Sequence, residues 1–350
     1  MKQRWVLYGA NGYTGQLIAA AAKKRGLSPI LAGRNREAIA SLAAETGLEH
    51  RVFPLGDPNV VRRELAGKAL VLHCAGPFSA TSQAMIDACL AQGCHYLDIS
   101  GEISVFANAY RQHEAARRAD VVLLPGAGFD VVPTDCLAAS LVGMLPAATR
   151  LVLAFASNGG LSPGTAKTGL EGLARGGCVR RGGQLQRVPL AWKSREIPFA
   201  GGPRLAVTIP WGDMFTAHVS TGIPDIEVYM AASPRAIRRL RYLRLLQPLL
   251  RWKWLQEKLK RRIGESVQGP SEEQRRHSRM ELWGEVGSAD GRTAAATMTT
   301  PNGYDVTVTA SLGIVEHLLD HDVEGGYYTP SLLLGEGYAM SLPGVTWQVS

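Results

Sequence analysis

The strongest constraint on this chain is the alternation, from residue 5 to residue 124, of short apolar runs with helix-forming stretches. The apolar runs are residues 5–8, 30–32, 51–53, 70–73, 96–98 and 121–124. Such short, nearly all-apolar runs are typical of strands that are buried on both faces of a parallel sheet. Helix-forming stretches stop before Gly26, Gly47 and Gly93, and glycine commonly follows the last residue of a helix. The alternation therefore predicts a doubly wound parallel sheet with helices on both faces.

A different kind of sequence begins after Pro146, where strand-like runs are separated by glycine-rich segments. These runs are residues 151–155, 205–209, 226–230, 280–286 and 305–310. They predict an α+β domain built on a mixed or antiparallel sheet. The length of 350 residues also suits two domains better than one core. We therefore expect a Rossmann-like domain over 1–146, a second domain over 147–320, and a tail, 321–350, that returns to the first domain.

The turn after the first predicted strand is rich in glycine, with Gly9, Gly12 and Gly15 at regular spacing. Glycines let the backbone turn sharply, approach a pyrophosphate without an intervening Cβ, and bring the next helix close to the sheet. The phosphates then rest on the electropositive start of that helix. Glycines also end strands for purely structural reasons, but the position between a strand and a helix favours a dinucleotide site. The predicted contacts are Gly9, Ala10, Asn11, Gly12, Tyr13, Thr14 and Gly15.

The end of the second predicted strand indicates which dinucleotide is bound. Arg34 and Asn35 follow this strand, at the position that meets the adenosine ribose. NAD sites usually place Asp or Glu there, whereas an arginine can bind the 2′-phosphate of NADP. Arg34 therefore predicts NADP, the alternative being a surface arginine that caps its own turn. Asp57 follows the third strand near the expected adenine, and a plain turn aspartate is an equal alternative.

The fourth predicted strand ends at His73 and is followed by Cys74, Ala75, Gly76 and Pro77. The carboxyl ends of parallel strands line the ligand crevice, so these four following residues are predicted cofactor contacts. Cys74 invites interpretation as a catalytic thiol. A lone cysteine on a buried strand is, however, more often a small core residue.

Five motifs in a fixed order make the chain resemble the saccharopine dehydrogenase-like reductases, in particular the branch that includes trans-acting enoyl reductases. The motifs are residues 8–15 (YGANGYTG), 32–35 (AGRN), 75–78 (AGPF), 95–102 (HYLDISGE) and 128–135 (GFDVVPTD). The resemblance continues more loosely through residues 162–165 and 329–330. It implies an NADP-binding Rossmann domain with an inserted substrate domain. It does not imply oxidation of saccharopine, because members of this branch differ in activity.

The resemblance also implies that several acidic side chains lie at the ends of the fifth and sixth strands, beside the nicotinamide. Asp98, Glu102 and Asp130 are the resulting catalytic candidates, with Asp135 close by. Glu102, Asp130 and Asp135 have a structural alternative as caps of the helices that follow them. Lys167, near the start of the first helix of the second domain, is a further candidate, because hydride transfer needs a proton donor. The sequence does not choose among these donors.

Residues 235–262 carry eleven Lys or Arg residues and a single acid, Glu257. Their apolar residues recur every three or four positions and predict an amphipathic helix interrupted at Pro248. These apolar residues are Ile237, Leu240, Leu243, Leu246, Leu250 and Trp254. Three uses compete: a solvated face, a membrane-surface element, and a landing patch for an acidic carrier or an anionic substrate. No nucleic-acid partner is predicted, since no recognisable binding module accompanies the charges.

The cysteines and the first residues bear on metal binding and location. The five cysteines form no CxxC pair and have no histidine at metal-ligand spacing, so no metal site is predicted. Residues 1–4 and the apolar run after them superficially resemble a signal peptide, but glycines interrupt that run at once. No uncharged apolar stretch is long enough to span a membrane. We expect a cytoplasmic protein, either soluble or peripheral at a membrane, and the sequence leaves a homodimer open.

Together these observations predict an NADPH-dependent reductase whose second domain binds a hydrophobic or acyl-like substrate with a reducible C=C or C=O. One alternative is an imine-type amino-acid dehydrogenase, which needs Arg or Lys side chains converging on several substrate carboxylates. Another alternative is a non-catalytic NADP-binding sensor or scaffold, because no residue is unmistakably a proton donor.

Overall fold

The computed structural model describes residues 4–157, 159–160, 162–250 and 252–349. Residues 1–3 of the N-terminal stretch and Arg251 of the predicted basic segment lie outside these described residues. The chain forms two compact units. The first contains Met1–Val132 and Tyr304–Leu333, and the second contains Pro133–Gly303 and Leu334–Ser350. The second unit is thus largely inserted into the sequence of the first.

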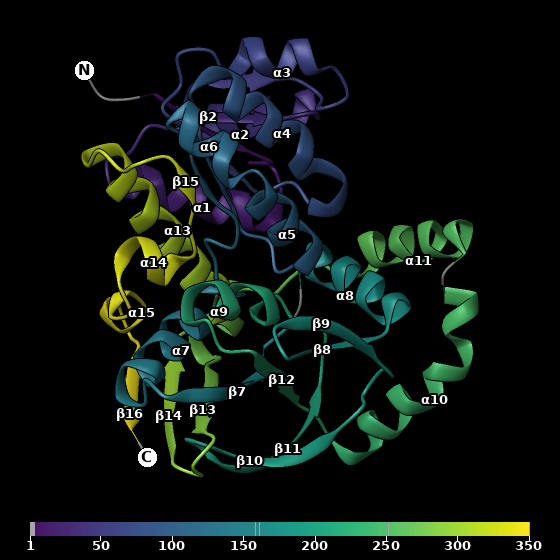
Figure 1. Cartoon of the computed structure of the whole chain (residues 1–350). Coiled ribbons are helices and arrows are strands. Elements are labelled where there is room, and N and C mark those ends of the chain that lie inside the picture. The colour runs from purple at the N-terminus through teal and green to yellow at the C-terminus, as the bar shows by residue number, and fades with distance from the viewer. Residues whose placement is uncertain (1–3, 158, 161, 251, 350) are drawn as a thin grey trace. The chain divides into compact units, whose positions relative to one another are not determined.

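In the described part of the first unit, seven strands form one sheet in the order β15-β6-β5-β4-β1-β2-β3 (Figure 1). All neighbouring strands run parallel. The strands are β1 (Trp5–Tyr8), β2 (Ile30–Gly33), β3 (His50–Val52), β4 (Leu70–His73), β5 (His95–Asp98), β6 (Val122–Leu124) and β15 (Gly326–Tyr327). The strand order reverses between β1 and β4, which is where ligands bind in such sheets. The predicted Rossmann-like sheet is confirmed.

The helices of the first unit connect these strands. They are α1 (Tyr13–Lys24), α2 (Arg36–Thr46), α3 (Pro58–Leu65), α4 (Phe78–Gln92), α5 (Ile103–Arg111), α6 (His113–Ala119) and α13 (Gly303–Asp320). α2 and α4 end as the sequence predicts, because Gly47 and Gly93 adopt left-handed φ angles of 70° and 64°. The predicted alternation of strands and helices is therefore a correct description of residues 5–124.

The structure corrects the interpretation of residues 305–310, which the sequence predicts as a strand. They lie inside α13, where Val306 and Val308 have relative exposures of 1% and 8%. β-branched residues favour strands when they fit a pleated surface, but they also fill a helix that is buried on most sides. Apolar residues continue at helical spacing through Leu312 and Val315. Burial of this long apolar helix overrides the local strand preference.

The second unit is built, within the described residues, on a nine-stranded mixed sheet. The main path runs β10-β11-β12-β7-β13-β14-β16, and β8 and β9 attach through β12. The strands are β7 (Ala148–Ser157), β8 (Gly177–Arg181), β9 (Gln184–Val188), β10 (Ser194–Phe199), β11 (Gly202–Thr208), β12 (Asp225–Ala231), β13 (Met280–Ser288), β14 (Thr293–Thr300) and β16 (Thr346–Val349). β7 and β12 pair in parallel, and the other pairs are antiparallel. The predicted mixed sheet of the second domain is confirmed.

The helices of the second unit pack against this sheet or extend from it. They are α7 (Val132–Met144), α8 (Pro163–Arg175), α9 (Asp213–Thr221), α10 (Pro234–Leu250), α11 (Lys253–Ser266), α12 (Glu272–His277), α14 (Pro330–Leu334, which begins in the first unit) and α15 (Tyr338–Ser341). A Cβ on Gly284 of β13 would lie 2.7 Å from Leu141 Cδ1 and 3.2 Å from Leu137 Cδ2. α7 therefore belongs with the second sheet, and the first unit's N-terminal segment ends at Val132 rather than at residue 146.

The basic segment forms two helices, α10 and α11, which Figure 1 shows at the outer margin of the second unit. α10 continues through residue 248 and ends at Leu250, so the interruption lies after the proline predicted to cause it. Among the described residues, no helix is both long enough and apolar enough to cross a membrane.

Replacing Leu31 by alanine tests the core of the first sheet. Leu31 lies in β2 with 0% exposure, and we expect Leu31→Ala to lower the free energy of unfolding by about 2–5 kcal/mol, because it leaves a cavity. Urea unfolding followed by circular dichroism measures this loss. The control is Leu332→Ala, since that side chain is 48% exposed. Equal losses in the two variants would contradict the placement of β2.

Candidate functional site

The turn after β1 is closed by backbone contacts that leave no room for side chains. The N–H groups of Gly9 and Ala10 both donate to the Ala32 carbonyl oxygen, at 2.7 and 3.1 Å. A Cβ on Gly15 would lie 2.3 Å from the Gly9 oxygen, and a Cβ on Gly9 would lie 2.7 Å from the Ala75 nitrogen. Gly9 also has a left-handed φ angle of 81°. Both positions therefore require glycine.

The first turn of α1 has no side-chain cap, unlike the two helices that follow it. The N-cap of α1 is Gly12, which has no side chain to accept a hydrogen bond. Asn35 Oδ1 accepts the Ala38 N–H at 3.2 Å at the start of α2, and Asp57 Oδ1 accepts the Asn59 N–H at 2.9 Å at the start of α3. Backbone N–H groups at an uncapped helix start bind anions. The start of α1 is therefore the best candidate for a phosphate site.

Arg34 follows β2 at the same edge of the sheet and is exposed. Its guanidinium lies close enough to Tyr8 to oppose the effect of burial, which raises the pKa of that phenol to about 12. The Tyr8 hydroxyl donates to the Phe53 carbonyl oxygen at 3.0 Å. Arg51 on the next strand pairs with Glu49, whereas Arg34 forms no ion pair with any described residue. The charge of Arg34 is thus available to an incoming anion.

The segment after β4, Cys74–Pro77, lies against the glycine turn and is held by Thr81. The Thr81 hydroxyl donates to the Ala75 carbonyl oxygen at 2.7 Å and lies 3.0 Å from His73 Nε2. Burial lowers the pKa of His73 to about 3 and raises that of the Cys74 thiol. His73 is therefore neutral at pH 7, and Cys74 is a thiol rather than a reactive thiolate. The segment offers backbone and small side chains to a ligand.

Asp98 joins the loops that follow β5 and β6. Its side chain has 0% exposure. Oδ1 accepts the N–H groups of Ser100 and Gly126 at 2.8 and 2.9 Å, and Oδ2 accepts the Tyr96 hydroxyl at 2.6 Å. Burial raises the pKa of Asp98, and these hydrogen bonds to the carboxylate oppose that rise. The contacts make Asp98 a positioning residue for the two loops.

The Glu102 carboxylate caps a helix other than the one it precedes. Its two oxygens accept the N–H groups of Phe78 and Ser79, each at 3.0 Å, at the start of α4. Pro77, the N-cap residue of α4, provides no side-chain cap there. Glu102 is the N-cap residue of α5, yet its side chain caps no N–H group of that helix. The predicted alternative of capping α5 is thus replaced by a tertiary contact that fixes the start of α4.

Asp130 is the candidate whose acid–base behaviour best fits a proton donor. It follows β6 and is partly buried, and burial raises the pKa of its carboxyl to about 7. Its Oδ2 lies 2.8 Å from the position that a Cβ of Gly101 would occupy, so a larger residue there would force the Asp130 side chain to shift. The Phe129 N–H donates to Thr307 Oγ1 at 3.0 Å, which ties the loop to α13. A carboxyl with a pKa near 7 exchanges protons at physiological pH.

Side chains from α13 support this edge, and sequence reasoning missed them. Besides Thr307, Tyr304 packs edge-on against Tyr13 beside the glycine turn, with ring centroids 5.0 Å apart. No sequence feature indicates that Tyr304 and Thr307 lie at this edge, because the sequence predicts this segment as a strand of the second domain. Lys167 belongs to the second unit, where its Nζ lies 3.2 Å from the position of a Cβ on Gly264 in α11. The other three catalytic candidates belong to the first unit.

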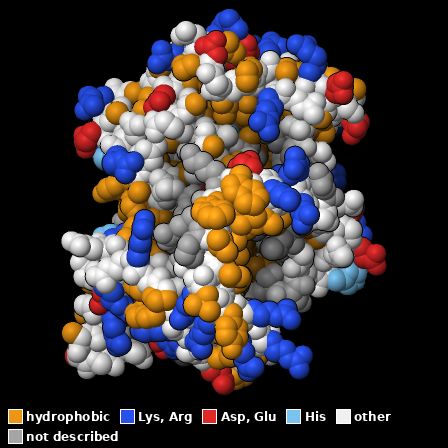
Figure 2. All heavy atoms as spheres, turned by 90° about the vertical axis from the view of Figure 1, so that its right-hand side faces the viewer, with side chains coloured by type: hydrophobic (Ala, Val, Ile, Leu, Met, Phe, Trp, Pro, Cys, Tyr) orange, Lys and Arg blue, Asp and Glu red, His pale blue; other side chains and the backbone are white. Residues whose placement is uncertain are grey.

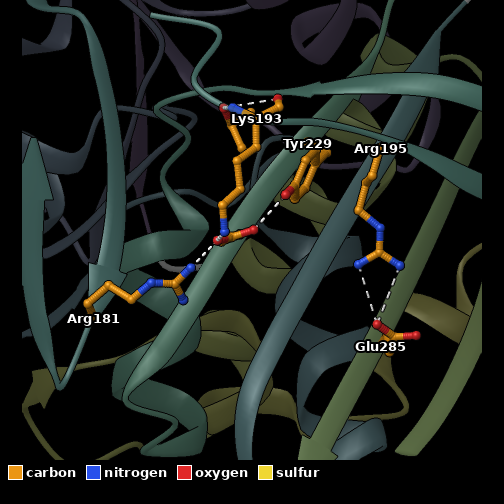
Figure 3. Close-up of polar contacts among 7 residues, drawn as sticks. Arg181, Lys193, Arg195, Tyr229 and Glu285 are labelled. Atoms are coloured by element: carbon orange, nitrogen blue, oxygen red, sulfur yellow. Dashed lines mark hydrogen bonds and ion pairs between the residues drawn. The ribbon is translucent and has the colours of Figure 1, made fainter. Parts of the chain in front are cut away.

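In the second unit, one glutamate of β12 gathers several polar side chains. Figure 3 shows Arg181, Lys193 and Tyr229 pointing toward one carboxylate, that of Glu227. Lys193 Nζ lies 2.8 Å and the Tyr229 hydroxyl 2.5 Å from its oxygens. Burial acts to raise the pKa of Glu227, but its hydrogen bonds and the two cations lower the pKa overall.

Two further cations of the same sheet are also paired with glutamates. The Arg195 guanidinium lies 3.5 Å from Glu285 (Figure 3) and over the Trp283 ring, 5.0 Å from its centroid. Arg204 pairs with Glu281. Each of these strand cations is therefore matched by a carboxylate of the same unit.

The sequence of the first unit matches the model of a known protein family. Residues 5–124 match the family model described as the saccharopine dehydrogenase NADP binding domain. Residues 5–124 are thus similar to this domain, which confirms both the predicted resemblance and the predicted cofactor, NADP.

The alignments with individual relatives cover only part of this chain and part of each relative. A saccharopine dehydrogenase-like oxidoreductase of Bos taurus is 30% identical over 155 residues, covering 37% of this chain and 35% of the relative. A trans-acting enoyl reductase of Mycobacterium leprae is 33% identical over 141 residues, covering 37% and 33%. The chain thus spans about a third of the length of these relatives.

A solved structure resembles the whole chain. Apo saccharopine dehydrogenase (L-Glu forming) of Saccharomyces cerevisiae matches 99% of this chain and 100% of its own, with a TM-score of 0.70 and 12% identity. At this identity the match supports the fold, a Rossmann-like parallel sheet with a second mixed sheet.

Gly15→Ala tests the glycine turn. The new Cβ would lie 2.3 Å from the Gly9 oxygen, so we expect NADPH binding to be lost and the free energy of unfolding to fall by about 1–3 kcal/mol. Fluorescence titration with NADPH and urea unfolding measure the two effects. Gly169→Ala is the control, because a Cβ there meets no atom within 4 Å. Wild-type affinity in Gly15→Ala would refute the role of the turn.

Proposed function

We propose that this protein is an NADPH-dependent reductase that acts on a hydrophobic or acyl-like substrate carrying a reducible C=C or C=O. The observation that carries the proposal is that an uncapped, glycine-lined start of α1 lies at the same sheet edge as Arg34, which forms no ion pair with any residue that the structure describes. The first suits a pyrophosphate, and the second suits the 2′-phosphate that distinguishes NADP from NAD. The names of the relatives, an oxidoreductase and an enoyl reductase, support the same reaction class.

The chain's own residues divide the chemistry as follows. The start of α1 and Arg34 would hold NADPH, which when bound would supply a hydride to one carbon of the substrate double bond. The second atom of that bond then needs a proton, and the Asp130 carboxyl, with a pKa of about 7, is suited to donate it. Asp98 and Glu102 are engaged with backbone N–H groups, so they hold the loops and helix starts that position the reactants. Water or buffer returns the proton to Asp130 after each turnover.

The charge pattern of the second unit favours an apolar substrate over a polycarboxylate. An imine-type amino-acid dehydrogenase needs Arg or Lys side chains that converge on substrate carboxylates. In this unit Arg181 and Lys193 are held by Glu227, and Arg195 is held by Glu285. Their charges are therefore largely compensated before any substrate arrives.

A non-catalytic NADP sensor or scaffold is the candidate function from a different class, and a specific measurement separates it from a reductase. A sensor binds NADPH but does not consume it with any of a panel of enoyl and keto thioesters. The raised pKa of Asp130 favours the reductase, because a perturbed carboxyl at a ligand-binding edge is typical of acid–base sites.

Arg34→Ala tests the choice of cofactor. A charge-assisted contact to the 2′-phosphate is worth about 1.5–3 kcal/mol, so we expect NADPH affinity to fall roughly 10- to 100-fold while NADH affinity stays the same. Fluorescence titration of both nucleotides measures this. Arg63→Ala is the control, because its side chain is 72% exposed at the end of α3. An equal loss of NADH affinity, or no loss of NADPH affinity, would contradict the assignment of Arg34 to the 2′-phosphate.

Asp130→Asn tests the proton donor. Because the protonated form donates, the wild-type rate of NADPH oxidation should fall as the pH rises through about 7. The variant should lose this limb of the pH profile and about 10²–10⁴-fold of the rate. Asp322→Asn, at an exposed position of the same unit, should keep the wild-type profile. An unchanged profile in Asp130→Asn would assign the proton to another donor.

A further inference from the structure

α10, α11 and the residues between them expose large apolar side chains. Of the twelve exposed large hydrophobic residues in the described part of the chain, six lie between Tyr242 and Trp254. We call these six side chains the exposed apolar face. With their exposures they are Tyr242 (66%), Leu245 (79%), Leu246 (49%), Leu249 (43%), Trp252 (53%) and Trp254 (61%). Apolar surface concentrated in this way marks an interaction site rather than ordinary surface.

Two polar side chains of α10 bind the backbone of other segments of the second unit. Arg244 donates to the carbonyl oxygens of Leu190 and Ala191, at 2.6 and 2.8 Å. Gln247 Nε2 donates to the Leu173 carbonyl oxygen at 3.0 Å. Ile237 is buried beside Val207, and the partly buried Leu240 packs against the same cluster. Arg244 and Gln247 thus occupy inward positions of α10, while Leu245, Leu246 and Leu249 are exposed beside the outward arginines.

The same segment concentrates the positive charge of the chain. Residues 235–262 carry a net charge of +10, from eleven cations and one acid, against +8 for the whole chain. The remainder of the chain is therefore slightly acidic. α10 itself contains five arginines and no acid. The basic character of this protein is thus a property of one segment.

The cations lie beside the exposed apolar face. Arg235, Arg238, Arg239 and the ring of Tyr242 line a shallow hollow near the start of α10. Figure 2, which views the side of the molecule on which Figure 1 draws α10 and α11, shows apolar side chains gathered with Lys and Arg around them. Guanidinium groups in such a hollow suit phosphate oxygens.

We propose that α10 and α11 dock this protein on the surface of an anionic lipid bilayer. The exposed apolar face would enter the boundary between headgroups and acyl chains, and the surrounding cations would bind lipid phosphates. Trp252 and Trp254 suit this depth, because tryptophan is enriched at membrane–water interfaces. The contact is peripheral, since no described helix can cross a membrane. The proposal goes beyond the reductase function and does not depend on it.

The charge distribution favours a bilayer over other occupants. A symmetric dimer through this face would bring two strongly basic segments together, and like charges repel. An acidic carrier would satisfy the arginines, but Leu245 and Leu249 need an apolar phase as well. An anionic bilayer supplies negatively charged headgroups for the arginines and, directly beneath them, an apolar acyl-chain region for the leucines.

Flotation of the full chain with vesicles tests the proposal. We expect binding to phosphatidylcholine vesicles that contain phosphatidylserine, weak binding to pure phosphatidylcholine, and loss of binding at high salt. Arg238→Gln with Arg239→Gln should weaken binding roughly 10- to 30-fold, because each Lys or Arg near an anionic membrane surface strengthens binding by roughly three- to fivefold. Leu245→Gln with Leu249→Gln should weaken binding at every salt concentration at which the wild type binds.

Matched controls keep the test specific. Lys23→Gln with Lys24→Gln removes two exposed charges from α1, and Leu332→Gln changes an exposed leucine elsewhere. Both controls should bind vesicles like the wild type. Circular dichroism and NADPH titration should give wild-type results for the α10 variants, so that lost binding does not reflect unfolding.

Three outcomes would overturn the proposal. The first is that the wild type does not bind phosphatidylserine vesicles at low salt. The second is that the wild type and both α10 variants bind vesicles equally. The third is that the protein does not bind vesicles but forms a dimer in light scattering, and that Leu245→Gln with Leu249→Gln dissociates this dimer. The last outcome would assign the face to a second copy. Vesicle binding without NADPH oxidation would remove only the proposed reductase function.

Discussion

The close contact between the Gly9 carbonyl oxygen and Gly15 is the constraint on which the first unit's site depends. It brings the start of α1 against the end of β1, and Gly9 in turn lies against the backbone of Cys74 and Ala75 at the end of β4. The strand order reverses between β1 and β4, and this contact lies at that point, where parallel sheets of this kind commonly bind ligands. Side chains at these positions would separate the two strands from the helix. An anion can therefore reach the helix start only because side chains are absent there.

Buried carboxylates act in two different ways around this edge. Asp98 and Glu102 each accept at least two backbone N–H groups, and they thereby connect segments that are distant in sequence. Asp130 lies over Gly101, and its raised pKa leaves its carboxyl ready to gain or lose a proton near neutral pH. Asp98 and Glu102 thus act as fixed connectors, while burial raises the pKa of Asp130, the proton donor proposed above.

The second unit uses its cations in two ways as well. Arg181 and Arg195 on the sheet, and Lys193 just before β10, are paired with glutamates, which limits their attraction for further anions. On α10, Arg244 binds backbone carbonyls while Arg235, Arg238 and their neighbours face solvent without an acid in the helix. The net charge of the chain does not distinguish the paired cations from those that face solvent. The distinction depends on whether a carboxylate or carbonyl oxygen of another element lies beside each cation.

Much of the first unit could be predicted from sequence alone. The doubly wound sheet, the glycine turn and Arg34 follow from local spacing, because strand length, glycine conformation and the residue after a strand are properties of a few neighbouring residues. Tertiary structure alone decided three features. Residues 305–310 became part of α13 because burial outweighed their strand preference. Glu102 became a cap for α4 because folding brings that helix start to it. Leu245, Leu246 and Leu249 of α10 are exposed, while carbonyl oxygens of distant segments hold Arg244 and Gln247 inward. Each depends on which segment packs against the residue, and local sequence does not contain that information.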